Sequence, residues 1–116
     1  MDHTADVGIR AYGKTLDELF ANAAAGMFSL ITDLETVKPV GEYEVTIAAK
    51  DVKSLLFDFL SELLVVHETQ KVLLSRARGE RIDRERHPLH LMVKAVTYHG
   101  MEVDPTKGEA QVIFDI

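Results

Sequence analysis

The chain has 116 residues, of which 47% are hydrophobic and 28% are charged, and its formal net charge is −6. This length and balance predict a single soluble domain over residues 1–116 and argue against a disordered chain. The lack of cysteine excludes disulfides, thiolate catalysis and cysteine-based zinc sites, and it fits a cytoplasmic location.

The chain begins with a strand pattern followed by a helix pattern. Residues 7–12 alternate between apolar and polar side chains, which predicts a strand with one buried face. Thr15 and Glu18 have capping-box spacing, in which the threonine caps the helix and the glutamate reaches back. Apolar residues at three- and four-residue spacing then predict a helix over 16–32.

The same order of elements repeats after a connector at 35–42. Alternation over 43–49 predicts a second half-buried strand. Asp51 is a good N-cap residue, and behind it a stronger apolar stripe predicts a helix that ends near His67.

The last part of the chain consists of short strand patterns and turns. We expect strands at 76–82, 90–98, 101–103 and 109–114, with the last two joined as a hairpin by the turn residues at 104–108. The predicted fold class is α+β, with two amphipathic helices packed on a mostly antiparallel or mixed β-sheet.

Five arginines gather in the segment 76–86, and acidic residues lie between them. Alternating charge is typical of a solvated strand and turn, whereas proteins that grip nucleic acid unaided usually carry a basic patch. Direct RNA or DNA binding is therefore not favoured, and no apolar run reaches the roughly 18 residues of a membrane span.

Carboxylates stand at both ends of the sequence. Asp2 and Asp6 flank His3 just before the first strand, and Asp115 follows the last apolar strand and precedes Ile116. Each aspartate could simply serve a turn or point to water. If the first and last strands are neighbours, however, Asp6 and Asp115 approach each other.

Two close carboxylates repel, and a shared proton or a cation resolves that repulsion. Ligands that are all oxygen favour a hard cation such as Ca²⁺ or Mg²⁺. If Ile116 is the C-terminal residue of the protein, its terminal carboxylate or carbonyl oxygen would be a further ligand. A metal-dependent hydrolase with His99 or His3 as the base, and a chaperone-like interaction module, both stay open at this point.

Lys94 and Glu102 lie in the segment that follows the second helix. Lys94 would share a strand face with Val96 and Tyr98. It is either an exposed lysine with its stem along the sheet or a positive group that pairs with Glu102 or with a partner's phosphate or carboxylate. The remaining histidines suggest no ligand cluster by spacing: His67, His87 and His90.

Five blocks of residues together resemble the archease family. They extend over nearly the whole sequence, and the combination of the first and third blocks with the closing Asp-Ile is far more specific than any block alone. The blocks are Asp2–Ile9, Gly26–Phe28 with Thr32-Asp33, Ser54–Leu56 with Leu60–Leu64, Val93–His99 and Phe114–Ile116.

This resemblance implies a non-catalytic protein cofactor of the tRNA-splicing RNA ligase, which promotes guanylation of the ligase and multiple turnover, with any RNA contact indirect. It implies a divalent metal, most commonly calcium, with magnesium or manganese as alternatives. The implied ligands are Asp6, Asp115 and Ile116. Lys94 and Glu102 are the candidates for acting on the ligase, and the loop residues Asp2 and His3 are less secure members of the site.

The chain departs from the family pattern at one place. The resemblance implies a longer stretch between Leu74 and Arg76, enough for an extra strand and a turn. Either a loop near 74–76 is missing from the sequence, or the deletion is genuine.

Overall fold

The structure, a computed structural model, describes residues 6–38, 41–42, 49–75 and 78–116. Its elements follow the chain as β1 (Asp6–Tyr12), α1 (Leu16–Ile31), a 3₁₀ turn η1 (Leu34–Thr36), β2 (Gly41–Glu42), α2 (Val52–Gln70), β3 (Val72–Ser75), β4 (Arg78–Arg81), β5 (Ala95–Asp104) and β6 (Glu109–Asp115).

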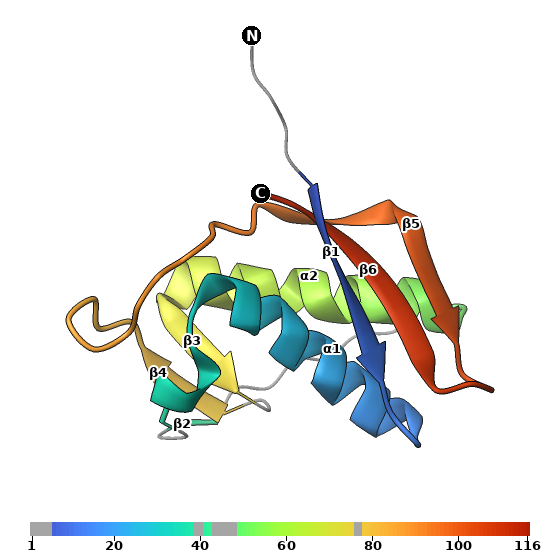
Figure 1. Cartoon of the computed structure of the whole chain (residues 1–116), viewed down its shortest axis with the longest axis horizontal. Helices are drawn as coiled ribbons and strands as arrows, with labels where there is room; N and C mark the ends of the chain where they lie inside the picture. The colour runs from blue at the N-terminus through green and yellow to red at the C-terminus, as the bar shows by residue number, and fades with distance from the viewer. Residues whose placement is uncertain (1–5, 39–40, 43–48, 76–77) are drawn as a thin grey trace, which may run out of the picture.

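The strands form two antiparallel sheets, and both helices pack against them (Figure 1). One sheet has the order β1-β6-β5 and the other the order β2-β4-β3. Helix α1 contacts β1 and β3, and α2 contacts β5 and β3. The α+β class is confirmed, with two separate sheets where the sequence predicted one.

Both helices begin at the predicted caps. The Glu18 N–H donates to the Thr15 hydroxyl at 3.1 Å, although the Glu18 carboxylate accepts from Lys14 N–H at 3.3 Å. Asp51 accepts from the Ser54 N–H at 2.8 Å. Helix α2 runs slightly beyond its predicted end, to Gln70.

The two helical stripes meet the apolar faces of the strands in a single core. Neither helix of the described residues combines the length and apolar character of a membrane span. The largest side chains that are fully buried come from both helices and from β3, β5 and β6: Leu19, Met27, Phe28, Leu56, Leu60, Leu73, Met101 and Phe114.

The segment before β5 differs from the prediction. A strand was expected at 90–98, but β5 begins only at Ala95. The reason is competition for hydrogen bonds: the N–H groups of His90 and Leu91 donate to the carbonyls of Ile31 and Leu30. Those carbonyls lie in the last turn of α1, where they have no partner inside the helix.

Strand β5 also passes through the position where two strands were expected. It is continuous to Asp104, with a register shift between Thr97 and Glu102. Gly100 has φ +81° within this shift, a conformation that glycine adopts without strain. The predicted hairpin is therefore real, but its first strand is longer than 101–103.

The remaining predicted strands lie close to undescribed residues. Strand β4 covers 78–81 of the predicted 76–82 and pairs with β3, so that Ser75 stands opposite Arg78. The strand predicted at 43–49 falls on residues outside the described part of the chain, apart from its last residue.

Candidate metal centre

The pairing of β1 with β6 brings the two acidic ends of the sequence together. The strands run antiparallel from the pair Tyr12 and Glu109 to the pair Asp6 and Asp115. Figure 1 shows the C-terminus beside the start of β1. The odd-numbered residues of β1 are buried or half-buried, so Asp6 lies on the open face.

The hydrogen-bond pattern of the sheet fixes how close the two aspartates are. The Lys94 N–H donates to the Asp115 carbonyl at 2.8 Å. Because the N–H and C=O of a strand residue point to the same side, the main chain of Asp115 faces β5 and not β1. Asp6 and Asp115 therefore form a non-hydrogen-bonded pair, the kind in which facing Cα atoms are only about 4.5 Å apart.

The closeness of these carboxyls raises the pKa of Asp115. The largest cause is the hydrogen bond between the Asp115 and Asp6 carboxyl groups, followed by partial burial and by the negative charge of Asp6. Lys94 acts in the opposite direction, because its positive charge favours the ionised form of Asp115. The net effect shows that the pair disfavours two negative charges.

Such a pair can hold either one proton or one cation between its oxygens. Within the described residues, no group of three or more His, Cys, Asp or Glu side chains could hold a metal ion. Among the described residues, a cation here would have two carboxylates and neighbouring main-chain oxygens available, such as that of Ile116, which directly follows Asp115. This set fits a hard cation that takes several ligands from carbonyls and water, as Ca²⁺ does, and it does not fit a thiolate or imidazole metal.

The other candidate residues are distributed unevenly around this pair. Lys94 adjoins it through its main chain and its charge. Glu102 stands opposite Gln111, four residues along β6 and about 13 Å away at the rise of a strand. His99 is four residues along β5 from Ala95, about 13 Å away at the same rise. Asp2 and His3 lie outside the described residues.

Comparison with known proteins decides the family. The model of the "Archease protein family (MTH1598/TM1083)" matches residues 1–116. This chain belongs to the archease family. The archease-like resemblance of the sequence blocks is thereby confirmed.

Relatives in the archease family cover the whole fold. Protein archease of Methanosarcina mazei is 39% identical over 136 aligned positions, with 100% of this chain and 93% of the relative covered. Protein archease of Saccharolobus islandicus, strain M.14.25, is 36% identical, with 97% of this chain and 92% of the relative covered. The solution structure of Methanobacterium thermoautotrophicum protein 1598 superposes with a TM-score of 0.80 at 37% identity, covering 100% of this chain and 96% of that one.

The archease of Methanosarcina mazei is longer within the matched region. Its alignment runs over 136 positions, whereas this chain has 116 residues. The relative therefore carries internal residues that this chain lacks. This agrees with the shortening inferred from the sequence, although its location near 74–76 stays a prediction.

This archease-family chain also contains a polar cluster that the sequence reasoning missed. Glu80 on β4 accepts hydrogen bonds from the Lys38 N–H at 2.9 Å and from His87 Nε2 at 2.7 Å, and it pairs with Arg86 at 2.7 Å. The His87 side chain is fully buried. Because His87 Nδ1 accepts from the Asp83 N–H at 2.9 Å, its Nε2 carries the proton that Glu80 accepts.

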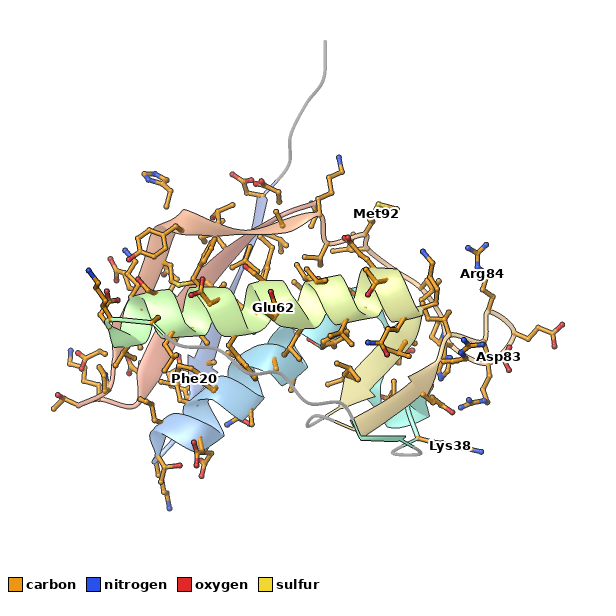
Figure 2. All side chains as sticks on the ribbon, turned by 180° about the vertical axis from the view of Figure 1, so that it is seen from behind. Phe20, Lys38, Glu62, Asp83, Arg84 and Met92 are labelled. Carbon is orange, nitrogen blue, oxygen red and sulfur yellow. The ribbon has the colours of Figure 1, made fainter. Side chains whose placement is uncertain are left out.

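The environment of Glu80 is the reverse of that of Asp115. Burial alone would raise the pKa of Glu80, but hydrogen bonds from Arg86, Lys38 and His87 and the charge of Arg86 outweigh it and lower the pKa to about 2. The prediction of a solvated mixed-charge segment over 76–86 was therefore wrong for Glu80. It holds for the exposed residues Asp83 and Arg84, which lie in the loop beyond the end of α2 in Figure 2.

No sequence signal could have found this cluster easily. Glu80 and His87 are seven residues apart and lie on a strand and in a loop. The third partner, Lys38, is 42 residues from Glu80. Only the fold brings the three together.

Proposed function

We propose that this chain is a metal-binding, non-catalytic activator of the tRNA-splicing RNA ligase. In this proposal Asp6, Asp115 and Ile116 hold a divalent cation, most suitably Ca²⁺. We call the end of the sheet that carries these three residues the acidic tip. With its cation bound, the acidic tip favours the form of the ligase that accepts guanylate on its active-site histidine, and it thereby allows multiple turnover. Membership of the archease family supports the ligase as the partner.

The observation that carries the proposal is the pairing of Asp6 with Asp115. Two carboxyls that hydrogen-bond each other at a sheet edge destabilise each other when both are ionised, as the raised pKa of Asp115 indicates. Such an arrangement is costly for stability alone, so it favours a binding role. The ligand must be positively charged and must accept oxygen donors.

Each residue of the tip would have a distinct part in this activation. Asp6 and Asp115 supply the negative oxygens, and Ile116 adds an oxygen at the end of β6. Lys94 keeps a positive charge beside the pair, which suits a partner's phosphate or carboxylate. A bound hard cation supplies positive charge that can neutralise negative groups in the partner's site.

Binding need not involve any catalysis by this chain. A helper that binds the competent conformation of the ligase more tightly than its other conformations shifts the population toward it. Glu102 lies on β5 opposite Gln111, too far from Asp115 to share this tip. A direct part for Glu102 in activation therefore requires a ligase surface that also covers the middle of the open sheet face.

The direct test is RNA ligation by the cognate ligase under multiple-turnover conditions. We expect Asp6→Ala and Asp115→Ala to lower the stimulated rate at least tenfold. Glu109→Ala is the matched control, because it removes an exposed carboxylate at the opposite end of the same strand. Full stimulation by both aspartate variants would show that the site does not matter.

A second measurement separates activation from catalysis. The chain alone is assayed with Ca²⁺, Mg²⁺ or Mn²⁺ on phosphomonoesters and on RNA. The proposal predicts no turnover that depends on Asp115. Metal-dependent turnover that Asp115→Ala abolishes would instead establish the chain as a phosphohydrolase.

A further inference from the structure

Apolar side chains are exposed beside the acidic tip. Met92 is 76% exposed, more than any other large hydrophobic residue in the described chain, and Val65 on α2 is 47% exposed. Figure 2 shows Met92 projecting above the C-terminal half of α2. Isolated exposed apolar residues are normal, so the question is whether these two belong to one surface.

A hollow of about 240 Å³ lies between α2 and the start of β5. Its lining is mostly apolar and comes from both elements: Phe57, Ser61, Leu64, Val65, Glu68, Lys94, Ala95 and Val96. Val65 therefore stands at a concave site rather than on an isolated turn of helix.

Met92 lies two residues before Lys94, which lines the same hollow. Val93 is buried, whereas its neighbours Met92 and Lys94 are both exposed. Burial therefore alternates over these three residues, and Met92 and Lys94 both lie at the surface while Val93 packs in the core. Because Lys94 lines the hollow, we define the ledge as Met92, Val65 and the hollow between α2 and β5.

The ledge is continuous with the acidic pair. The Lys94 main chain is hydrogen-bonded to the Asp115 carbonyl at 2.8 Å, and the Lys94 charge acts on the Asp115 carboxyl. A body that contacts both the acidic pair and Lys94 would reach the hollow, because Lys94 lines it. The open face of the sheet offers the opposite character, because polar residues fill it around Arg10, Glu102 and Gln111.

Charges at the rim of the hollow indicate what its occupant must carry. Lys94 is positive and Glu68 is negative, and both line it. An apolar side chain flanked by an acidic group on the Lys94 side would bury the apolar wall and leave both charges paired or in water. Methionine suits such a contact because its unbranched side chain adapts to the partner's shape.

We propose that the ledge is the surface on which the RNA ligase docks, by placing an apolar side chain in the hollow against Val65 and Met92. This inference rests on the proposed function, because it takes the ligase as the partner. It assigns different tasks to adjoining surfaces: the ledge supplies affinity, and the acidic pair supplies activation.

The test measures affinity and maximal stimulation separately in the full-length chain. For Met92→Ser combined with Val65→Ala, we expect the concentration for half-maximal stimulation of ligation to rise about tenfold, as when contact residues of an interface are truncated. The maximal stimulation at saturation should not change. Both residues are exposed, so folding should be retained, and circular dichroism checks this.

Two control variants make the result specific. Leu16→Ala truncates another exposed apolar residue, 38% exposed at the start of α1, and should leave the half-saturating concentration unchanged. Asp115→Asn should lose stimulation yet still bind the ligase in calorimetry. An unchanged half-saturating concentration in the double variant would overturn the ledge while leaving the proposed function intact.

The two proposals can also fail in the opposite order. If the wild-type chain binds the ligase without stimulating it, the proposed function fails, and calorimetry with the double variant still decides the ledge. If the wild-type chain neither binds nor stimulates the ligase, both proposals are wrong.

Discussion

In the described part of the chain, the carboxyl groups of Glu80 and Asp115 have opposite surroundings. At Glu80, three donors surround one carboxylate, one of them the positively charged Arg86, and the pKa of Glu80 falls to about 2. At Asp115, the main neighbour is a second carboxyl, and the pKa rises. The first cluster is complete within the chain, whereas the second requires a proton or a cation from outside.

This difference separates a structural role from a binding role. A buried polar group that is fully hydrogen-bonded rigidifies the fold around it. In the Glu80 cluster, Arg86 links the loop that leads toward β5 to Glu80 on β4. Arg86 also donates to the Thr36 carbonyl at 2.8 Å, which links the same loop to η1. A pair of like charges does not stabilise a fold, and it persists where a ligand uses it.

The largest expected effect concerns the structural cluster. His87→Ala removes a side chain that is fully buried and leaves the Asp83 N–H without its acceptor. We expect the free energy of unfolding to fall by about 2–4 kcal/mol, as measured by urea denaturation.

His90→Ala is the matched control for that experiment. Its imidazole contacts Asp33 at 3.0 Å, but the side chain is 50% exposed. A surface pair of this kind contributes about 0–1 kcal/mol. An equal fall in the free energy of unfolding for the two variants would show that the buried cluster stabilises the fold no more than a surface pair does.

The second prediction reverses the usual result of removing a charge. In metal-free buffer at pH 7, Asp115→Asn should raise the free energy of unfolding, because it removes repulsion from Asp6. Glu80→Gln should lower it, because Arg86 loses its partner. Urea denaturation in the presence of a chelator measures both. A loss of stability in both variants would remove the distinction between the clusters.

The third prediction is a pair of opposite pH dependences. The raised pKa of Asp115 gives stability that is full below the ordinary value of 3.8 and is lost as pH rises through the raised value. The lowered pKa of Glu80 gives stability that is present above 4.5 and is lost as pH falls toward about 2. Melting temperatures between pH 2 and pH 7, with chelator, should show both trends.

Variants assign each trend to its cluster. Asp115→Asn should abolish only the loss of stability as pH rises above about 3.8. Glu80→Gln should abolish only the loss of stability as pH falls below about 4.5. If either variant leaves the wild-type profile unchanged, the corresponding carboxyl does not control it.

The smallest expected effect concerns Lys94. Its charge partly offsets the causes that raise the pKa of Asp115. Lys94→Met should therefore raise the pKa of Asp115 further, which a carboxyl-carbon NMR titration measures. Lys107→Met, at the hairpin turn beyond the other end of β6, should leave it unchanged. A fall in the pKa of Asp115 in Lys94→Met would contradict the assigned role.

Local patterns predicted the parts of this fold that depend on near neighbours in sequence. The caps at Thr15 and Asp51 and the apolar stripes behind them placed both helices. The meeting of Asp6 with Asp115 was predicted only on the condition that the first and last strands pair, and the register confirms that condition.

The features that the sequence did not predict depend instead on residues that are far apart in the sequence. The segment that begins at His90 does not start as a strand, because the N–H groups of His90 and Leu91 donate to carbonyls of α1, some 60 residues earlier. His87 is paired in the interior with Glu80, and Glu80 also accepts from the distant Lys38 N–H. No periodicity encodes such contacts, because each depends on where distant elements have already packed.

The most direct test of the central claim is a Ca²⁺ titration of the full-length chain at pH 7, followed through the carboxyl-carbon NMR signals of its aspartates. The account predicts that the Asp6 and Asp115 signals move together and saturate with one ion per chain, and that Asp115→Asn abolishes the saturable change. Unchanged signals of both aspartates during the titration, with ligation still stimulated, would contradict it.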